Sequence, residues 1–239
     1  MSPDFESITN SVFKENLWGD SESRSGPGSN LQNTNEIRVK IPELIIRYNI
    51  KLLIDAPCGD FNWMKGISKK LEGLLNLYLG IDIVDEVIAL NITTFATDKI
   101  KFARADLTKD SLPKYDCVLC RDLFLHLPYK SILKVICNFK RSGIHYMLIS
   151  TYTNPRKNSN VLNFDIDGRA LNMQKFPFNL PDPIEIINEK YTGQNGEYND
   201  KSLALWKLDS IKTRSIAVRI LLSLPFFFIK SAFRTIFNV

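Results

Sequence analysis

Four aspartates stand at the ends of apolar segments, and this repeated placement is the first feature of the sequence that could support chemistry. Asp55, Asp82, Asp106 and Asp122 each close a short apolar run of the kind that forms a buried strand. A single aspartate in such a place is usually a solvated loop residue or a helix cap. Four in the same register predict an acidic edge that could hold a polar or cationic ligand.

The segment RDLFLHL, residues 121–127, adds a residue that could move a proton. Asp122 and His126 are four positions apart, so they would share one helix face if a helix has already begun at Asp122. Imidazole can accept a proton from a hydroxyl nucleophile near neutral pH. We expect His126 to be the base or the group that orients the acceptor, and Asp122 to be its partner or a substrate ligand. In the alternative interpretation, His126 packs at the start of the helix and only fixes the loop.

The turn DAPCGD, residues 55–60, limits the class of cofactor. A pyrophosphate site uses several glycines so that backbone amides can approach the phosphates. This turn has one glycine, Gly59, together with two carboxylates and Pro57, which lacks an amide hydrogen. It is therefore a poor pyrophosphate site, and a nicotinamide-dependent oxidoreductase is disfavoured. A cationic cofactor with a nucleoside half fits better, because carboxylates favour its positive groups and Gly59 permits close approach.

The sequence does not indicate a metal site. Cys117 and Cys120 have a spacing seen in redox and zinc sites, but residues three apart on a strand point to opposite faces. No tight cluster of Asp, Glu and His has chelating spacing, so we expect the chemistry to proceed without a metal. His145 has no acid or cysteine cluster beside it and is expected to be structural.

These residues lie within an alternation of strand-like and helix-like patterns that begins near residue 50. The expected parallel strands are residues 50–56, 77–83, 100–106, 115–122 and 144–152. Residues 183–191 and 202–208, with a turn-rich segment between them, predict an antiparallel hairpin. The expected fold class is therefore α/β: a Rossmann-like, mainly parallel seven-stranded sheet with a C-terminal antiparallel hairpin and helices on both faces.

Residues 1–49 precede this domain and are expected to form two helices joined by a loop. Residues 5–18 have the apolar spacing of a short amphipathic helix. Asn33 and Glu36 predict a capped start for the second helix, and Pro42 predicts a kink or break in it. The loop between them, residues 19–30, is rich in Gly and Ser, and such a segment can be a flexible linker or can cover a ligand.

The net charge of +5 comes entirely from the C-terminal segment. Residues 211–239 hold five basic residues and no acid, so residues 1–210 hold 26 basic and 26 acidic groups. A neutral body argues against broad binding of nucleic-acid phosphates. The tail also holds five of the fifteen phenylalanines, which favours a peripheral contact with an anionic membrane. The alternative is a terminal helix that packs on the sheet or on another subunit.

The N-terminus, the cysteines and the length of the apolar runs together predict a cytoplasmic protein. The first ten residues, MSPDFESITN, are acidic and polar, unlike a secretory signal. The four cysteines lack the spacing of a disulfide framework. Between Arg219 and Lys230 lie ten uncharged residues, too few to cross a bilayer about 30 Å thick. Any membrane contact is therefore expected to be peripheral, at the cytoplasmic face.

Three motifs resemble those of one set of class I S-adenosylmethionine-dependent methyltransferases. They are WGDSESRSGPGS at 18–29, LIDAPCGDFNWM at 53–64 and CRDLFLHL at 120–127, with GIDI and ADL between the last two. The resemblance covers about residues 12–208, and it is the combination that is specific. Members of this set are associated with glycan assembly, so the resemblance implies a methyl acceptor that is a sugar hydroxyl of a cell-surface or lipid-linked glycan. A methyltransferase of another small molecule or protein, and a non-catalytic cofactor-binding protein, are the alternatives.

The resemblance also implies a role for each part of the S-adenosylmethionine site. Residues 55–60 would flank the methionine moiety, Asp82 would bind the ribose hydroxyls, and Asp106 with Leu107 would bracket the adenine. The Gly/Ser loop would fold over the cofactor. The implied cofactor-binding residues are Ser25, Gly26, Ser29, Asp55, Ala56, Pro57, Gly59, Asp60, Phe61, Asp82, Ile83, Asp106, Leu107 and Arg121. Residues 50–210 would form the cofactor-binding domain.

The segment after the fifth expected strand, residues 154–183, combines polar groups, aromatic rings and turn formers. Its expected place over the carboxyl edge of the sheet suits an insertion that binds the acceptor. Asp165, Asp167 and Arg169 could contact sugar hydroxyls there, although the two aspartates would also suit a solvated turn.

Overall fold

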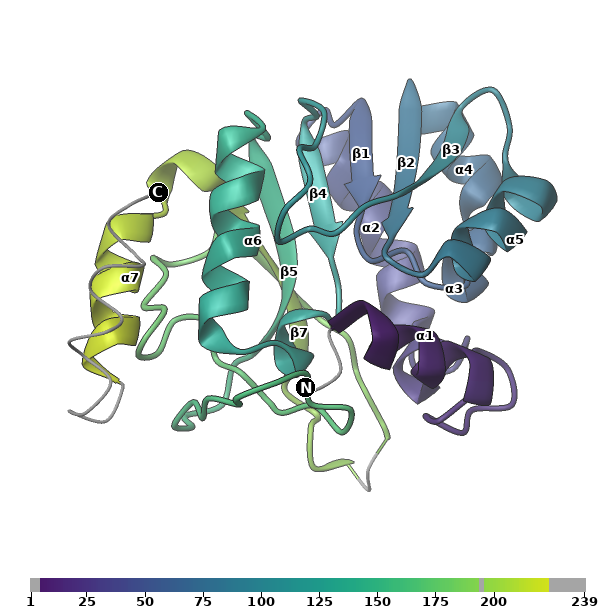
Figure 1. Cartoon of the computed structure of the whole chain (residues 1–239). Coiled ribbons are helices and arrows are strands. Elements are labelled where there is room, and N and C mark those ends of the chain that lie inside the picture. Colours follow the sequence, from purple (N-terminus) through teal and green to yellow (C-terminus); the bar gives the residue numbers. More distant parts are fainter. Residues whose placement is uncertain (1–4, 194–195, 224–239) are drawn as a thin grey trace.

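The computed structural model describes residues 5–193 and 196–223 of the chain and is built around one sheet (Figure 1). The strands lie in the order β3-β2-β1-β4-β5-β7-β6. Their bounds are β1 Leu52–Asp55, β2 Leu77–Asp82, β3 Ile100–Arg104, β4 Cys117–Cys120, β5 Tyr146–Tyr152, β6 Glu185–Asn188 and β7 Lys201–Lys207. The first five are parallel, and β7 runs antiparallel to both β5 and β6. The predicted α/β class with a C-terminal hairpin is confirmed.

Helices cover both faces of this sheet. Their bounds are α1 Phe5–Glu15, α2 Asn35–Arg47, α3 Asn62–Lys65, α4 Ser68–Leu74, α5 Asp85–Phe95, α6 Tyr129–Arg141 and α7 Thr213–Leu222. The helices α2, α4 and α5 lie on one face and α6 and α7 on the other (Figure 1). The helix α1 lies apart from both layers, on the side to which the carboxyl ends of β1, β2 and β4 point.

The strand β4 shows how the sequence supports two cores. All four of its residues are buried, as expected for a central strand covered on both faces. Cys117 and Leu119 pack in the core under α2, whereas Val118 and Cys120 pack in the core under α6. The prediction that the two thiols of this segment diverge is therefore confirmed, and both are free cysteines.

Two local predictions for α2, the capping box and the break at Pro42, are wrong. Asn33 and Glu36 do not form a capping box: the N-cap is Thr34, without a side-chain cap, because the Asn33 amide donates to the Pro27 carbonyl in the preceding loop. Pro42 does not break the helix, which continues to Arg47. The apolar face on either side of Pro42 is buried against the sheet, and this packing offsets the lost backbone hydrogen bond.

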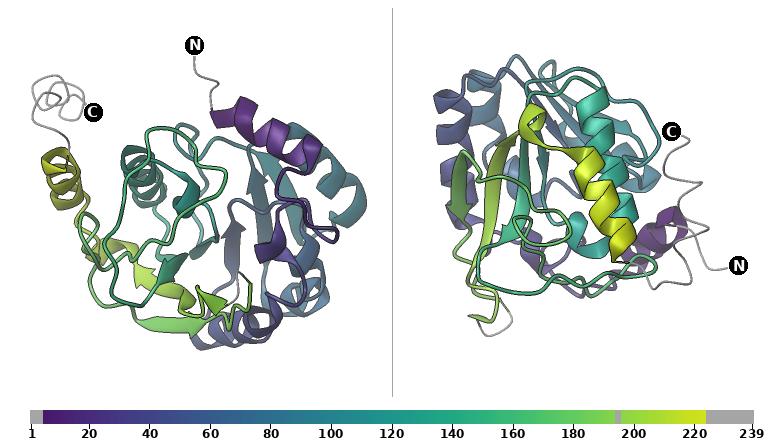
Figure 2. Two further views of the ribbon diagram at one scale, coloured as in Figure 1. Left: turned by 90° about the horizontal axis from the view of Figure 1, so that it is seen from below. Right: turned by 90° about the vertical axis from the view of Figure 1, so that its left-hand side faces the viewer.

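The first part of the expected tail packs on the domain. Ile216, Ile220 and Leu221 of α7 are buried, and the helix lies alongside α6 (Figure 2). Arg219 donates hydrogen bonds to the carbonyl oxygens of Pro177 and Phe178, at 2.7 Å each. The remaining tail residues, 224–239, lie outside the described part of the chain. Within the described part, no helix has the length and apolar character needed to cross a bilayer.

Candidate functional site

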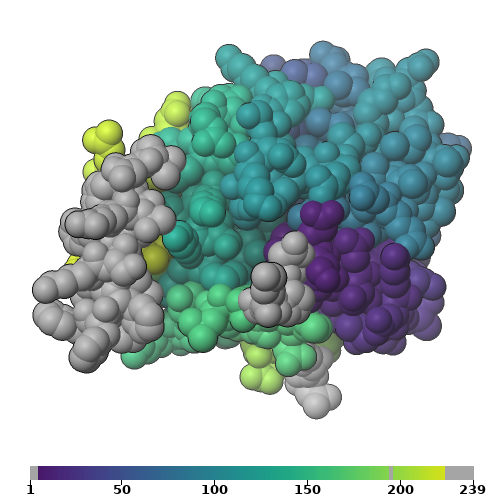
Figure 3. All heavy atoms as spheres, in the orientation of Figure 1, coloured from purple at the N-terminus to yellow at the C-terminus, as the bar shows by residue number. Residues whose placement is uncertain are grey.

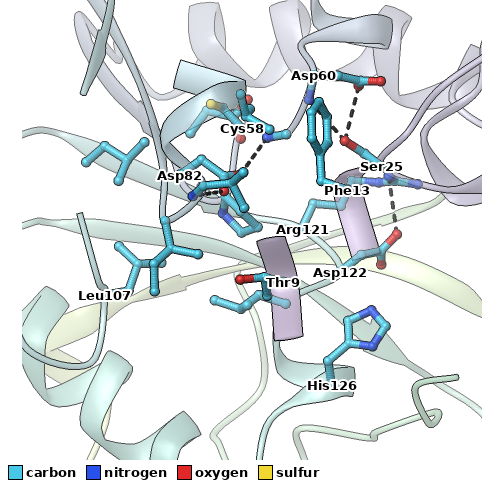
Figure 4. A pocket seen from close by; sticks show the side chains of 18 of the residues that line it. Thr9, Phe13, Ser25, Cys58, Asp60, Asp82, Leu107, Arg121, Asp122 and His126 are labelled. Atoms are coloured by element: carbon cyan, nitrogen blue, oxygen red, sulfur yellow. Dashed lines mark hydrogen bonds and ion pairs between the residues drawn. The ribbon is translucent and has the colours of Figure 1, made fainter. Parts of the chain in front are cut away.

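An open pocket lies at the carboxyl ends of β1, β2 and β4, where the predicted acidic edge falls (Figure 4). The space within it, including the part open to solvent, is about 1130 Å³. Its walls come from the turns that follow these strands, from the N-terminal segment 5–29, and from Phe164 in the insertion after β5. Figure 3 shows the purple N-terminal segment beside the green segment that follows β5. Elements distant in sequence therefore close one site.

Most of the predicted site residues line this pocket. They are Ser25, Ser29, Asp55, Pro57, Gly59, Asp60, Asp82, Ile83, Asp106, Leu107, Arg121, Asp122 and His126. Three predicted residues lie outside the lining. Gly26 packs against Trp18, Ala56 is fully buried, and the Phe61 ring belongs to the core with Tyr78 and Phe102. All three are buried next to residues that line the pocket.

The turn after β1 is held by Asp82 at the end of β2. The Gly59 amide donates to Asp82 Oδ2 at 3.0 Å, and the Val84 amide donates to Oδ1 at 3.1 Å. Burial raises the pKa of Asp82, and these backbone hydrogen bonds oppose the rise. Gly59 has a φ of 53°, and a Cβ there would lie 2.2 Å from Ser25 Oγ. This position therefore needs glycine for its conformation and for the approach of the loop.

Asp55 is a second buried acid in the same half of the pocket. It is 2% exposed, and the Tyr78 hydroxyl donates to its Oδ2 at 2.5 Å. Burial raises its pKa to about 7, although the Tyr78 hydrogen bond and the charge of Arg121 act in the opposite direction. Among the described residues, neither Asp55 nor Asp82 has a salt-bridge partner within 4.0 Å. A cationic ligand would supply the missing countercharge.

The Gly/Ser loop lies over the pocket and is tied to it. Ser23 Oγ and Ser25 Oγ donate to Asp60 at 2.9 and 3.1 Å, and the Arg24 amide donates to it at 2.8 Å. At the other end, Arg121 Nη2 donates to the Gly28 carbonyl at 2.8 Å. The loop is therefore part of the site and not a free linker.

Asp122 sits in a buried network of charges. Its Oδ2 is 2.5 Å from Lys201 Nζ and 3.2 Å from Arg121 Nη1, and its Oδ1 accepts a hydrogen bond from Ser150 Oγ at 2.9 Å. Arg121 Nη2 also lies 2.6 Å from Glu189 Oε2. Burial alone would raise the pKa of Asp122, but Arg121 and Lys201 hold it well below its usual range. This carboxylate stays ionised at neutral pH and is a poor proton acceptor.

The expected helix face shared by Asp122 and His126 does not exist. Asp122 has a φ of 56°, in the left-handed region, and α6 begins only at Tyr129. His126 instead ends a short 3-10 turn and has Nδ1 2.6 Å from the Asp165 carbonyl oxygen. This contact favours the tautomer with hydrogen on Nδ1 and leaves Nε2 as the acceptor. Burial lowers the pKa of His126 below 6.5, so the ring is neutral at pH 7.

Two of the polar residues expected to bind the acceptor, Asp165 and Arg169, also make contacts within the protein. Arg169 uses its guanidinium to hold the turn before α6: Nη1 donates to the Leu125 carbonyl, Nη2 to that of Leu127 and Nε to that of Ser159, at 2.7 Å each. A short turn leaves such carbonyls without helix partners, which explains the arrangement. Asp165 supplies the carbonyl that contacts His126. These bonds use three of the five guanidinium N–H groups, and the expected sugar contact of Arg169 stays a prediction.

Sequence reasoning missed several residues of the site. Phe5, Thr9 and Phe13 line the pocket from one face of α1, and their spacing of four was visible, but nothing in the sequence connected that face to the pocket. Trp18, Arg24, Trp63 and Phe164 also line it. Glu189 and Lys201 reach Arg121 and Asp122 from the hairpin, and no local pattern predicts a pairing over such separations. Among the described residues no cluster of three or more His, Cys, Asp and Glu could hold a metal ion.

Comparisons with known proteins show the fold. No family model matches the sequence, and no curated protein matches it. The magnesium protoporphyrin IX methyltransferase of Synechocystis PCC 6803, with bound SAM, matches with a TM-score of 0.57 at 12% identity, over 85% of this chain and 97% of that one. The N-methyltransferase NodS of Bradyrhizobium japonicum WM9, in complex with S-adenosyl-L-homocysteine, matches with a TM-score of 0.55 at 12% identity, over 82% of this chain and 97% of that one.

A larger protein shows the same likeness in part. Human N-acetylserotonin methyltransferase, in complex with SAM, matches with a TM-score of 0.52 at 14% identity, over 72% of this chain. The matched region is 51% of the human chain, so this chain spans about half the length of that enzyme. At these identities the likeness is one of fold alone. The chain therefore has the Rossmann-like fold of class I methyltransferases, with a seven-stranded mixed sheet and a C-terminal antiparallel hairpin.

Proposed function

We propose that the protein is an S-adenosylmethionine-dependent methyltransferase. The observation that carries this proposal is a pair of buried acids at the carboxyl ends of β1 and β2, Asp55 and Asp82, which form no salt bridge with any described residue. A ligand with an amino group and a sulfonium would neutralise that edge. Solved structures of the same fold are described with bound SAM or S-adenosyl-L-homocysteine, which supports the choice of ligand.

The residues present fit this cofactor. Residues 55–60 would flank its methionine part, with Gly59 allowing the backbone to approach it. Asp82, which already accepts two backbone hydrogen bonds, has further lone pairs for the ribose hydroxyls. Asp106 and Leu107 would bracket the adenine. Burial would raise the pKa of Asp106, but Lys109 and Thr108 hold it below its usual range, so it would stay an acceptor for an amino group.

S-adenosylmethionine supplies an electrophilic methyl group, and the protein must orient the acceptor, exclude water and accept a proton. His126 is neutral at pH 7 and lines the pocket, so Nε2 can accept the proton of an acceptor hydroxyl. Asp122 is a fixed negative charge that favours the protonated imidazole without touching it. The Gly/Ser loop and α1 cover the site and exclude water.

The acceptor that we propose is a sugar hydroxyl of a cell-surface or lipid-linked glycan. This choice is supported by the motif resemblance and by a mouth lined with aromatic residues from two segments, Phe5 and Phe164 among them. Incubation with labelled S-adenosylmethionine and extracted cell-surface glycans tests it, because label must enter the glycan. Label that enters only a low-molecular-weight or protein fraction would instead support another methyltransferase.

The cofactor and the base are tested separately. Calorimetry should detect binding of S-adenosylmethionine and of S-adenosylhomocysteine, and absence of both would contradict the proposal. His126→Ala should lower kcat about 10²–10⁴-fold with nearly unchanged cofactor affinity. His145→Ala is the matched control, because His145 stands at the start of β5, outside the pocket lining. We expect activity without a metal, so loss on chelation that a divalent cation reverses would contradict this part.

We also propose a cytoplasmic protein that contacts membranes through the C-terminal segment. The basic, acid-free sequence of residues 211–239 supports this, whereas the packing of α7 limits the contact to the exposed side of that helix and to residues 224–239. Full-length protein should float with anionic vesicles and release as salt rises. A chain ending at Ser223 keeps α7 and should stay folded but not float. Equal flotation of both would show that residues 224–239 do not bind membranes.

A further inference from the structure

Two aromatic rings from different segments pack against the imidazole of His126. The Phe164 ring lies 5.1 Å from it, centroid to centroid, with an interplanar angle of 25°. The Trp18 ring lies 5.5 Å from it at 35°. The two rings come from segments far apart in the sequence, and each contacts the imidazole. The two contacts restrict rotation of the imidazole ring.

The Nδ1 side of the imidazole is closed as well. The Asp165 carbonyl lies 2.6 Å from Nδ1, and a Cβ on Gly168 would lie 3.1 Å from Cε1 and 2.3 Å from Leu125 Cδ1. The segment 165–168 therefore wraps tightly round the Nδ1–Cε1 edge of the ring. His126 nevertheless lines the pocket, so the edge that is left to face it carries Nε2.

Each of the two rings is itself anchored. The Trp18 indole donates its hydrogen to the Ile166 carbonyl at 2.9 Å, which joins the N-terminal segment to the same wrapping segment. The Phe164 ring meets Phe5 of α1 edge-on at 5.1 Å. The indole N–H of Trp18 is thus occupied and is not offered to an acceptor. The Phe164 ring is stacked on the imidazole and the Trp18 ring is tilted against it, and both contacts restrict the orientation of the imidazole.

We propose that Trp18 and Phe164 are positioning residues that hold His126 in one orientation, with Nε2 directed at the acceptor. This inference rests on the proposed role of His126 as the proton acceptor. A proton acceptor must lie about 2.6–3.2 Å from the hydroxyl it serves, and a misplacement of 1 Å can cost about a hundredfold in rate. The rings contribute by keeping that geometry before the acceptor binds. Through the contact of Phe164 with Phe5 they also link the base to α1.

The protonation of His126 reports on this packing. Burial lowers its pKa, while the Asp165 carbonyl and the charges of Asp122 and Asp165 raise it and Lys201 lowers it. Removing a ring lets water reach the imidazole and leaves these charges in place. The pKa of His126 should then move up towards 6.5, and the ring should populate both neutral tautomers. A ring that only filled space would leave the tautomer unchanged.

The test is an NMR titration of the two histidines in wild type, Trp18→Leu and Phe164→Leu. His126→Ala assigns the signals, and His145 serves as the internal reference. We expect the His126 titration midpoint to rise in each variant, with loss of the single tautomer. In methyl-transfer assays kcat should fall about tenfold to a hundredfold, its acidic limb should move to higher pH, and the KM for cofactor should be nearly unchanged.

Matched variants make the outcome decisive. Phe176→Leu changes a 49% exposed ring of the same insertion and should leave the His126 titration unchanged. Trp18→Phe keeps an aromatic face without the indole N–H, folds more readily than Trp18→Leu, and should retain most of the wild-type titration. An unchanged midpoint and tautomer in both leucine variants overturns the inference, even if His126→Ala is inactive. Absence of any methyl transfer contradicts the proposed function, whereas the titration still decides the positioning.

Discussion

The two halves of the pocket edge treat their acids in opposite ways. At β1 and β2, Asp55 and Asp82 are buried without a salt bridge, and burial raises the pKa of both. At β4 and the hairpin, Asp122 has Arg121 and Lys201 within 3.2 Å, and these cations hold its pKa well below its usual range. Both halves have carboxylates at strand ends, and the difference lies in what the rest of the chain places against them.

This difference in charge pairing suggests different functions for the two halves of the pocket. An acid that the protein leaves without a countercharge is costly in the free state and gains most from a cationic ligand. An acid that already has cationic partners gains little from such a ligand. It holds its neighbouring side chains in place and contributes a fixed negative charge to the pocket. We therefore propose that the half at β1 and β2 is the half that binds the cofactor, here called the binding half. The half at β4 holds the Gly/Ser loop through the hydrogen bond from Arg121 to the Gly28 carbonyl.

The largest effect that we expect concerns the neutralised half. Glu189→Gln should lower the free energy of unfolding by about 3–5 kcal/mol, because Arg121 would lose its closest carboxylate while remaining buried. Urea denaturation monitored by circular dichroism measures this. The control is Glu43→Gln, which breaks an exposed pair with Lys40 and should cost less than about 1 kcal/mol. Equal losses in the two variants would show that the network is not a stabilising unit.

The next effect tests the binding half. Asp82→Ala should weaken S-adenosylmethionine binding by about 1.5–3 kcal/mol, since the ribose hydroxyls and the Gly59 amide would lose their acceptor. Calorimetry on the folded variant measures it. Asp85→Ala removes the neighbouring but exposed carboxylate at the start of α5 and should bind as wild type does. Unchanged affinity of Asp82→Ala would disprove its role in ribose binding.

The pH dependence of stability gives the third prediction. The pKa of Asp55 is about 7 in the folded state and 3.8 when the carboxyl is free of burial, so protonated Asp55 stabilises the fold most below about pH 4. That contribution is lost as the pH rises through 7. Asn resembles the protonated acid, so Asp55→Asn should gain stability relative to wild type between pH 5 and pH 8, by on the order of 2 kcal/mol. If the free energies of unfolding of the two proteins changed with pH in the same way, the raised pKa of Asp55 would be disproved.

The binding half was largely predictable from the sequence, and the other half was not. Asp55, Gly59 and Asp82 lie in turns that directly follow strands, so the local pattern and the parallel sheet together place them at one edge. The hairpin was predicted too, but not that its Glu189 and Lys201 would reach back to Asp122. Such pairings depend on the register of β7 on β5, which a single sequence does not contain.

The turn around His126 shows a second limit. Spacing alone suggested a helix from Asp122, whereas the chain adopts a left-handed residue there and a short 3-10 turn after it. Arg169, 44 residues beyond Leu125, stabilises that turn by its hydrogen bonds to the carbonyls. The residue types of the site were therefore predictable, and the tertiary contacts that override local helix spacing were not.

The smallest effects compare one hydroxyl in each half. Tyr78→Phe removes the hydrogen bond to Asp55 Oδ2. Ser150→Ala removes the hydrogen bond that Ser150 Oγ donates to Asp122 Oδ1 and the one that it accepts from the Asp122 amide. Asp122 keeps Arg121 and Lys201, so Ser150→Ala should cost only about 0.5–1 kcal/mol of unfolding free energy at pH 7. Asp55 has no salt bridge to compensate, so Tyr78→Phe should cost about 1–2 kcal/mol at pH 8, where the carboxylate is ionised.

The two variants should also differ in how their cost depends on pH. The Tyr78 hydroxyl stabilises the ionised form of Asp55 and so lowers its pKa, which means that its removal raises the pKa further above 7. The cost of Tyr78→Phe should therefore shrink below pH 6, where the acid is protonated in both proteins. The cost of Ser150→Ala should stay constant from pH 5 to pH 8, because Asp122 is ionised throughout that range. Denaturation curves at several pH values separate the two, and a cost of Ser150→Ala that varied strongly over this range would mean that Asp122 is not held ionised by its two cations.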